Sequence, residues 1–404
     1  MRSSARITAL IGAGATLEIK GPSTCEITQA ICEDSFTQDV KNTLDSFLDP
    51  EGRHGARDCG TRQLCARPTT FEDIFDALEG LYSWSSTEPS YSPDFKPRMA
   101  AFAQLTEQRW KDGPAILESI KHAVGTIAKT VEHSSGKFDP NGEHQWFAGF
   151  FAQHEAWDVA TLNYDRIFEG LWTPAAFTDG YDRRGVPPHR FDPQRLGDQS
   201  RHRLMHLHGC ITLGHLLPRS GDRTASWEDL YQFDDYDRAS KTWFNRTQNT
   251  AQSGRVAIIG PIITGLQKTD KITAEPYLDY FMQLRQWLRD TPRLLVAGYS
   301  FGDLHLNEAL RRFARHGSER RIVVVTMIPK ELRDYWHYSH TEEYLGGRTL
   351  YLLAALGGDK HPVGEFRQYQ QPLVSLDGCC HVYVEGMQAA LQHHGDHIRE
   401  FLRS

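Results

Sequence analysis

Three short apolar segments, each followed at once by a glycine or polar turn, constrain the fold of this chain most. They are Arg6–Ile11, Asp158–Leu162 and Arg293–Ala297. Their nearly continuous apolar character is typical of strands that are buried on both faces of a parallel sheet. Because helical patterns lie between such segments, the sequence predicts an α/β protein built on a parallel sheet. Four more segments have the same character: Leu204–Leu207, Val256–Ile259, Ile322–Thr326 and Leu350–Leu353.

The region after the first of these segments has a helical pattern instead. Thr69-Thr70 followed by Glu72 and Asp73 is a helix-capping signal, and apolar residues then recur at helical spacing. We therefore expect a sheet domain of residues 1–25 and 156–404, and a mostly helical inserted subdomain of residues 26–155. Further helices are predicted at 34–48, Leu105–Trp110, Ile116–Ile127 and Met387–Leu402, and loops at 49–68 and 83–98.

Charge and cysteine content exclude several classes of protein. The net charge of −7 argues against a general nucleic-acid binder, which is usually basic. Seven cysteines include no Cys-x-x-Cys pair, so a zinc ribbon is not supported and we expect no metal. The neighbouring Cys379 and Cys380 are interpreted as buried small apolar residues.

The N-terminal segment imitates a signal peptide only weakly. Arg2 and Arg6 precede a short apolar run, but Thr8 and two glycines interrupt that run. No later segment approaches 18 uncharged apolar residues, so we expect no membrane span. A reducing cytoplasm fits this chain best.

The first turn, Gly12-Ala-Gly14-Ala-Thr16, resembles part of a phosphate-binding fingerprint. A glycine turn after a strand lets backbone N–H groups approach a pyrophosphate. The full dinucleotide fingerprint requires a third glycine where Leu17 stands, and an acidic residue after a second strand. A hydride-transferring dehydrogenase is therefore poorly supported, and by itself this pattern is also consistent with a plain tight turn.

The third turn, Gly298-Tyr-Ser300-Phe-Gly302, matches the Gly-x-Ser-x-Gly nucleophile elbow. His361 is a candidate base for such a serine hydrolase. However, few clear strands remain after this turn to carry the other two members of a triad. The competing interpretation is that the Ser300 hydroxyl binds a nucleotide phosphate or ribose. The arginine-rich segment 179–203 is interpreted as a solvated loop.

Taken in order, the motifs resemble the sirtuin superfamily, and more specifically the sirtuin-like NAD hydrolases of bacterial anti-phage defence. The resemblance covers about residues 6 to 330 and implies a Rossmann-like sheet with a helical insertion after the first strand. The motifs that carry it are Gly12-Ala-Gly14-Ala-Thr16, Thr161-Leu-Asn163-Tyr-Asp165, Leu207-His208-Gly209, Pro261 with Lys268, and Gly298-Tyr-Ser300-Phe-Gly-Asp303 with Asn307.

The resemblance also implies a role for each motif. Asn163 and His208 match the catalytic asparagine and histidine of the family, and Asp165 matches the aspartate that follows the asparagine. His206 is assigned to structure. The remaining matches would bind NAD: Gly12, Ala13, Gly14, Ala15 and Thr16 at the pyrophosphate, and Gly298, Ser300 and Asp303 on the adenosine side.

These residue types suit cleavage of the nicotinamide glycosidic bond. The transition state gains oxocarbenium character, so the protein has to position groups and stabilise charge. The chain lacks the zinc module of the protein-deacylating sirtuins, and Gly21-Pro22-Ser23 only faintly resembles their next motif. Water is therefore the favoured acceptor, with nicotinamide and ADP-ribose as products.

The expected function is accordingly that of an NAD+ glycohydrolase acting as a regulated effector of anti-phage defence by NAD depletion. NAD is the substrate, and we expect a homo-oligomer, a separate partner such as a HerA-type ATPase or an Argonaute, and no membrane or direct nucleic-acid binding. Three alternatives remain open: an NAD-dependent protein deacylase, a Ser300-based α/β hydrolase, and a non-catalytic NAD or ADP-ribose sensor.

Overall fold

The computed structural model of this chain forms two compact units. The sheet unit contains Met1–Gly21, Ser134–His208 and Leu278–Ser404, and the helical unit contains Pro22–His133 and Gly209–Tyr277. The structure describes residues 6–48, 69–85, 113–152, 156–216, 229–242, 248–250, 256–258, 260–265, 268–315, 319–327, 372–374 and 378–404.

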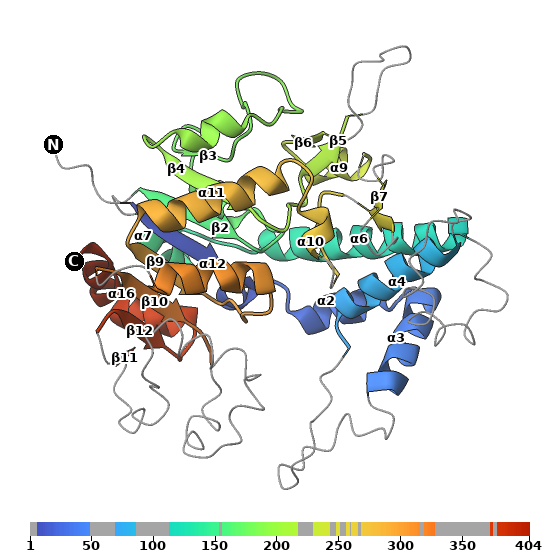
Figure 1. Ribbon diagram of the computed structural model, residues 1–404, viewed down its shortest axis with the longest axis horizontal. Coiled ribbons are helices and arrows are strands. Elements are labelled where there is room, and N and C mark those ends of the chain that lie inside the picture. The colour runs from blue at the N-terminus through green and yellow to red at the C-terminus, as the bar shows by residue number, and fades with distance from the viewer. Residues whose placement is uncertain are drawn as a thin grey trace, which may run out of the picture. The chain divides into compact units, whose positions relative to one another are not determined.

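The described part of the sheet unit contains an eight-stranded sheet (Figure 1). Neighbouring strands are parallel throughout, except that the edge strand β11 runs antiparallel to β12. In spatial order the strands are β11 (Leu373–Val374), β12 (Cys380–Tyr383), β10 (Arg321–Val325), β9 (Arg293–Ala297), β1 (Ile7–Ile11), β2 (Trp157–Thr161), β4 (His202–His206) and β3 (Phe177–Thr178).

The strand order is that of a Rossmann-like fold. Without the two edge strands β3 and β11, the order β4-β2-β1-β9-β10-β12 corresponds to 3-2-1-4-5-6 in chain order. The direction of winding reverses between β1 and β9, where such sheets form a crevice. The predicted α/β fold with a parallel sheet is confirmed.

Five of the predicted strands are found as β1, β2, β4, β9 and β10, displaced by at most two residues at either end. Strand β12 was not predicted from the sequence. The residues of the predicted strand Leu350–Leu353 lie outside the described ranges.

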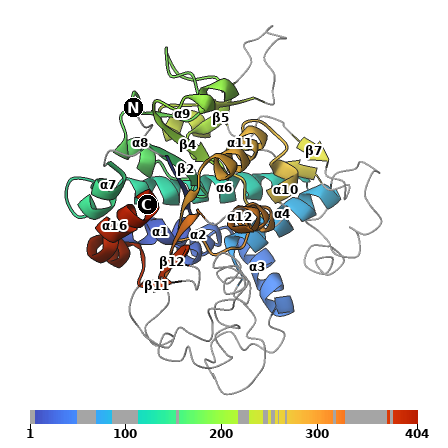
Figure 2. The same ribbon diagram turned by 60° about the vertical axis from the view of Figure 1, so that its left-hand side comes forward.

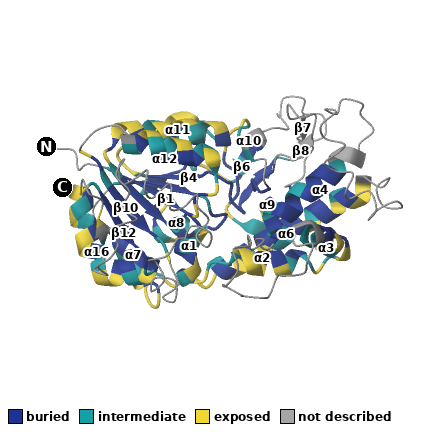
Figure 3. Ribbon diagram, turned by 60° about the horizontal axis from the view of Figure 1, so that its bottom comes forward, coloured by how far each residue is buried: buried dark blue, intermediate teal, exposed yellow. Residues whose placement is uncertain are grey.

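Helices cover both faces of the sheet, which explains why its central strands are buried throughout. On one face, α7 (Gln145–Ala152), α8 (Ile167–Leu171) and α16 (Met387–Arg403) join the strands in one hydrophobic cluster. Figure 2 shows α7 beside α16, and these two helices are in contact. Figure 3 shows α11 (Tyr277–Asp290) and α12 (Leu304–Arg315) on the opposite face.

Helix α7 belongs to the sheet unit because of its aromatic residues. The Phe151 ring centroid lies 5.0 Å from that of Trp157 on β2 and 5.1 Å from that of Phe168 on α8. Residues 134–152 therefore pack with the sheet. The sequence had placed them in the helical insertion of residues 26–155.

The helical unit also includes residues that follow β4. It contains α2 (Thr24–Ile31), α3 (Ser35–Leu48), α4 (Phe71–Ser85), α6 (Gly113–Ser135), α9 (Tyr236–Ser240) and α10 (Lys268–Lys271), with two antiparallel strand pairs, β5–β6 (Leu213–His215, Leu230–Gln232) and β7–β8 (Gln248–Thr250, Val256–Ile258). The expectation that Val256–Ile259 joins the parallel sheet is therefore wrong, because Val256–Ile258 form β8 and pair with β7.

The predicted helix cap at Thr70 is present. The Thr70 hydroxyl donates to Asp73 Oδ2 at 2.7 Å, and the Thr70 amide donates to the same oxygen at 2.9 Å. Helix α4 therefore begins at Phe71 because these bonds satisfy groups at its first turn. The helices expected at 34–48 and Ile116–Ile127 are found as α3 and within α6. Leu105–Trp110 and most of the two predicted loops lie outside the described residues.

Two further expectations concern cysteines and membranes. Cys380 on β12 is buried, as predicted, whereas Cys379 is half-buried, and neither forms a disulfide bond with another described residue. No helix in the described parts of the chain has both the length and the apolar character needed to span a membrane.

Candidate functional site

The predicted site residues follow the carboxyl ends of four adjacent strands in the sheet unit. The turn Gly12–Thr16 follows β1, Asn163 and Asp165 follow β2, His208 follows β4, and the turn Gly298–Asp303 follows β9. Ligands of open α/β sheets bind at this edge, at the point where the winding direction reverses. The topology therefore brings all eleven predicted residues to the edge of the sheet where a ligand site is expected.

The turns after β1 and β9 are packed backbone against backbone. The Gly12 amide donates to Ala297 O at 2.8 Å, and the Gly14 amide donates to Gly298 O at 2.9 Å. Gly298 has φ +61°, and a Cβ built on it would lie 1.8 Å from Ala15 N. This close approach alone requires glycine at these positions.

Three amides of the first turn have partners within the protein. Besides Gly12 and Gly14, Ala15 donates its amide to Gly12 O at 3.0 Å. The Thr16 hydroxyl donates to Ala13 O at 3.1 Å. The glycine pattern is thus explained by packing, and it does not by itself indicate a phosphate. The assignment of the turn to a pyrophosphate stays a prediction that depends on the neighbouring residues.

Asn163 is the polar side chain that links the first two turns. Its Nδ2 donates to Thr16 Oγ1 at 3.2 Å, with a longer contact of 3.5 Å to Gly12 O. Its Oδ1 is buried and has no hydrogen-bond partner among the described residues. Because a buried polar atom without a partner costs about 1–3 kcal/mol, such an acceptor is typical of a site that binds a ligand.

Asp165 is buried at the start of α8. Its Oδ1 accepts a hydrogen bond of 3.2 Å from the Ile167 amide. Burial raises the pKa of this carboxyl to about 6, although the Ile167 amide and the charge of His206 act to lower it. The carboxylate is therefore held in a position where its charge is poorly solvated, beside the end of β2.

His206, assigned to structure from the sequence, makes two polar contacts at the end of β4. Its Nδ1 lies 3.2 Å from Asn163 O and its Nε2 lies 3.0 Å from Glu169 Oε1. Burial acts to raise the pKa of Glu169, but His206, Arg166 and Arg183 together outweigh it, so this pKa is lowered. The imidazole therefore connects α8 to the backbone of Asn163 and helps to hold that residue in place.

His208 is buried and follows β4, and it lies close to the carboxylate of Asp303, which follows β9 on the other side of β1. Its Nε2 is 3.8 Å from Asp303 Oδ1, and the Asp303 side chain is only 13% exposed. His305, which the sequence analysis missed, offers a third atom to this group, because the ligand atoms of His208, Asp303 and His305 all lie within 4.8 Å of one another. The spacing Asp303-x-His305 at a helix start was the signal that could have found it.

The turn after β9 is held rigidly by a tyrosine and an asparagine. Tyr299 Oη donates to Asn307 Oδ1 at 3.0 Å, and Asn307 Nδ2 donates to Phe301 O at 2.8 Å. Ser300 is exposed, and the positive φ angles of this turn belong to Gly298 and Phe301. A nucleophile elbow needs its strain at the serine, so this geometry favours the ligand-binding interpretation of Ser300.

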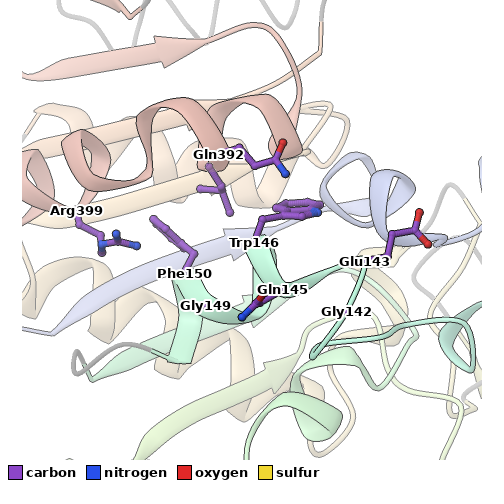
Figure 4. Close-up of a pocket in the computed structure, with 9 residues that line it drawn as sticks. Gly142, Glu143, Gln145, Trp146, Gly149, Phe150, Gln392 and Arg399 are labelled. Atoms are coloured by element: carbon purple, nitrogen blue, oxygen red, sulfur yellow. The ribbon is translucent and has the colours of Figure 1, made fainter.

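A surface groove of about 510 Å³ lies between α7 and α16 (Figure 4). None of the predicted site residues lines it. Its lining is formed by Gly142, Glu143, Gln145, Trp146, Gly149, Phe150, Leu391, Gln392 and Arg399. We place the candidate site at the carboxyl edge of the sheet instead, because the polar groups gather there.

Part of the chain is similar to a known protein family. Residues 158–344 match the family model described as the SIR2-like domain. No curated protein sequence matches the chain.

Two solved structures are similar at low identity. One, described as the structural basis for the mechanism and regulation of Sir2 enzymes, is 10% identical with a TM-score of 0.32, over 98% of this chain and 93% of that chain. Another, described as the structural basis for sirtuin substrate affinity, is 13% identical with a TM-score of 0.27, over 82% and 85%.

The SIR2-like match includes the ends of β2, β4 and β9, which carry Asn163, His208 and Ser300. The part of the chain that carries these residues, 158–344, is therefore similar to the SIR2-like domain.

Proposed function

We propose that this protein is an NAD+ glycohydrolase that cleaves NAD+ to nicotinamide and ADP-ribose. The environment of the Asn163 side chain supports this proposal most strongly. Asn163 is tied through Nδ2 to the turn after β1, while its buried Oδ1 has no partner among the described residues. An amide held in this way offers a fixed acceptor to a ribose hydroxyl or a water at the crevice of the sheet.

The proposed reaction needs water, a positioned ribose and a proton acceptor. The bond between C1′ of the ribose and the nicotinamide nitrogen breaks, and its electron pair neutralises the cationic ring. A water oxygen then bonds to C1′ and loses one proton. His208, on the neighbouring strand end, is the proposed acceptor of that proton, because imidazole titrates near neutral pH.

The remaining residues are proposed to bind and orient NAD. The turn Gly12–Thr16 and Ser300 would bind the phosphates and the adenosine side. Asp165 would supply negative charge near the developing positive charge of the ribose. The carboxylate of Asp303 lies 3.8 Å from His208 Nε2, so it would favour the protonated imidazole that forms when the water is deprotonated.

The test is nicotinamide release from NAD+ by purified wild type, Asn163→Ala and a matched control, Asn141→Ala. Asn141 is exposed, so its loss leaves the proposed site intact. We expect Asn163→Ala to lower the rate by at least about a hundredfold, the typical cost of one positioned polar group in a transition state. Release that survives in Asn163→Ala would show that the proposed site is wrong.

Each of the alternatives predicts a different experimental result. A protein deacylase would turn over NAD+ only when an acylated peptide is present. A Ser300-based hydrolase would be labelled by a fluorophosphonate without NAD+. A sensor would bind NAD+ or ADP-ribose tightly and release no nicotinamide.

We further propose that the enzyme is a cytoplasmic effector of anti-phage defence, active as a homo-oligomer or with a separate partner such as a HerA-type ATPase or an Argonaute. Unrestrained NAD+ loss would harm the host cell, so an inactive state is expected until a trigger arrives. Mass photometry measured together with NAD+ turnover tests this. A monomer that hydrolyses NAD+ at full rate by itself would contradict the proposal.

A further inference from the structure

Two imidazoles and one carboxylate meet at the start of α12, the helix that follows β9 in the chain. His208 is buried, Asp303 is 13% exposed at its side chain, and His305 is half-buried. One imidazole and the carboxylate are already 3.8 Å apart, and no ligand atom of the three is more than 4.8 Å from another.

These distances are close to those of a metal-ligand set. Ligand atoms about 2.0–2.2 Å from a tetrahedral zinc ion lie about 3.4 Å from one another. The three atoms therefore have to approach one another by at most about 1.4 Å to bind one ion, which side-chain torsions can provide. Three protein ligands also leave one position open, as in catalytic and exchangeable sites.

The chemistry of the ligands selects the kind of ion. Two imidazoles and one carboxylate suit zinc, iron, cobalt or nickel, whereas magnesium and calcium prefer oxygen ligands throughout. The carboxylate also supplies the negative charge that a divalent cation requires.

The surroundings hold the backbone of Asp303 and the ring of His305 in place. The amide of Asp303 donates to Tyr299 Oη at 3.1 Å, which fixes the start of the helix. The ring of His305 packs against Phe281 with their centroids 4.8 Å apart. Ligands that are oriented by their neighbours in this way lose less entropy when they bind a metal.

We propose that His208, Asp303 and His305 form a binding site for one divalent transition-metal ion, with Zn²⁺ as its representative, and that the bound ion inhibits NAD+ cleavage. The inhibitory part rests on the proposed function. Coordination uses the lone pair of the His208 imidazole, so this nitrogen is no longer available to accept a proton from water. The metal would thus act as a reversible inhibitor at the same site.

The binding test uses the untagged full chain, stripped of metal with a chelator, and titrated with Zn²⁺ by calorimetry. The variants are His305→Asn and Asp303→Asn, with His122→Asn as the matched control because His122 is an exposed imidazole outside the cluster. We expect one tight site in wild type and His122→Asn. Either cluster variant should lose at least about tenfold in affinity, because even residues that only support a ligand contribute 10–100-fold.

Thermal unfolding with and without Zn²⁺ separates a lost site from a lost fold. Wild type should gain thermal stability when it binds the ion, whereas His305→Asn should melt near the metal-free wild-type temperature and gain nothing. Equal binding by wild type and both cluster variants, or no binding by wild type, would overturn the proposed site.

The activity test measures nicotinamide release in chelator and in a saturating excess of Zn²⁺. Wild type should lose at least about tenfold in rate with the metal, whereas His305→Asn should need at least about tenfold more Zn²⁺ for the same loss. Metal that binds but leaves the wild-type rate unchanged, or raises it, would overturn the inhibitory role. If no variant releases nicotinamide, the proposed function fails, and the calorimetry still decides whether the metal site exists.

Discussion

Buried polar and charged groups are paired differently at the amino ends and at the carboxyl ends of the same strands. At the amino ends of β1, β2 and β4, Arg6 and Arg203 meet Asp158 between them. Arg203 binds the carboxylate through two bonds of 2.6 Å, and Arg6 Nε binds it at 2.9 Å. At the carboxyl ends of the same strands lie Asn163 and His208. There the amide oxygen has no partner among the described residues, and the imidazole lies 3.8 Å from Asp303.

This difference distinguishes charged groups that stabilise the fold from polar groups that are available to bind a ligand. At the amino edge, a bidentate ion pair and the stacking of Arg203 over Trp287 satisfy the charges within the protein. At the carboxyl edge, burial raises the pKa of Asp165 to about 6, so the charged form of this side chain is disfavoured. Polar groups that are buried at a cost are typical of binding and catalytic sites.

The largest effect that we predict is at the amino edge. Asp158→Ala leaves the buried Arg203 without its carboxylate, so the free energy of unfolding should fall by about 3–5 kcal/mol. Urea unfolding measures this free energy. The control is Glu308→Gln, which removes an exposed pair with Arg312 and should change stability by less than about 0.5 kcal/mol. Equal losses in both variants would mean that the amino edge is not a stabilising centre.

An intermediate effect is expected where the turns after β1 and β9 meet. Gly298→Ala places a Cβ 1.8 Å from Ala15 N on a residue with φ +61°, so it should cost about 2–4 kcal/mol and lower NAD+ turnover. Gly302→Ala is the matched control in the same turn, because its Cβ meets only Ser300 Oγ at 3.7 Å. Unfolding curves of the two variants should therefore differ clearly, and similar curves would argue against the close packing.

The smallest effect concerns the pH dependence of stability at the carboxyl edge. Because folding raises the pKa of Asp165 from 3.8 to about 6, this group favours the folded state fully below pH 4 and loses that contribution as the pH rises through 6. Asp165→Asn keeps the acceptor for the Ile167 amide without the charge. It should match wild type near pH 4 and exceed it by up to about 3 kcal/mol above pH 7.

Urea unfolding at several pH values between 4 and 8 measures this difference. A difference between the two proteins that is constant with pH would contradict the buried charge.

Much of the fold was predictable because its signals are local. Continuous apolar runs marked β1, β2 and β9, and the capping pair Thr70 and Asp73 marked the start of α4. Strand β8 was predicted, but its partner was not, because an apolar run does not encode which strand it pairs with. Helix α7 was assigned to the insertion because its aromatic contacts with β2 are not visible in a local pattern.

The candidate site was predictable only in part. The order of its motifs pointed to Asn163, His208 and Ser300 through a family resemblance. His305 was missed because one histidine in a helix carries no signal until its neighbours are known. Likewise, the glycines of the first turn suggested a phosphate, whereas the structure shows that they are also required by the backbone of Gly298.

The sequence by itself determined many of the elements and the turns that follow them, because hydrophobic periodicity, glycine and capping residues act over a few positions of the chain. Only the tertiary structure decided which polar groups meet: Asn163 with Thr16, and His208 with Asp303 and His305. Asn163 and Thr16 are 147 positions apart in the chain, and His208 and Asp303 are 95 positions apart. They come together because parallel strands place their carboxyl ends at one edge of the sheet, whatever the distance between them along the chain.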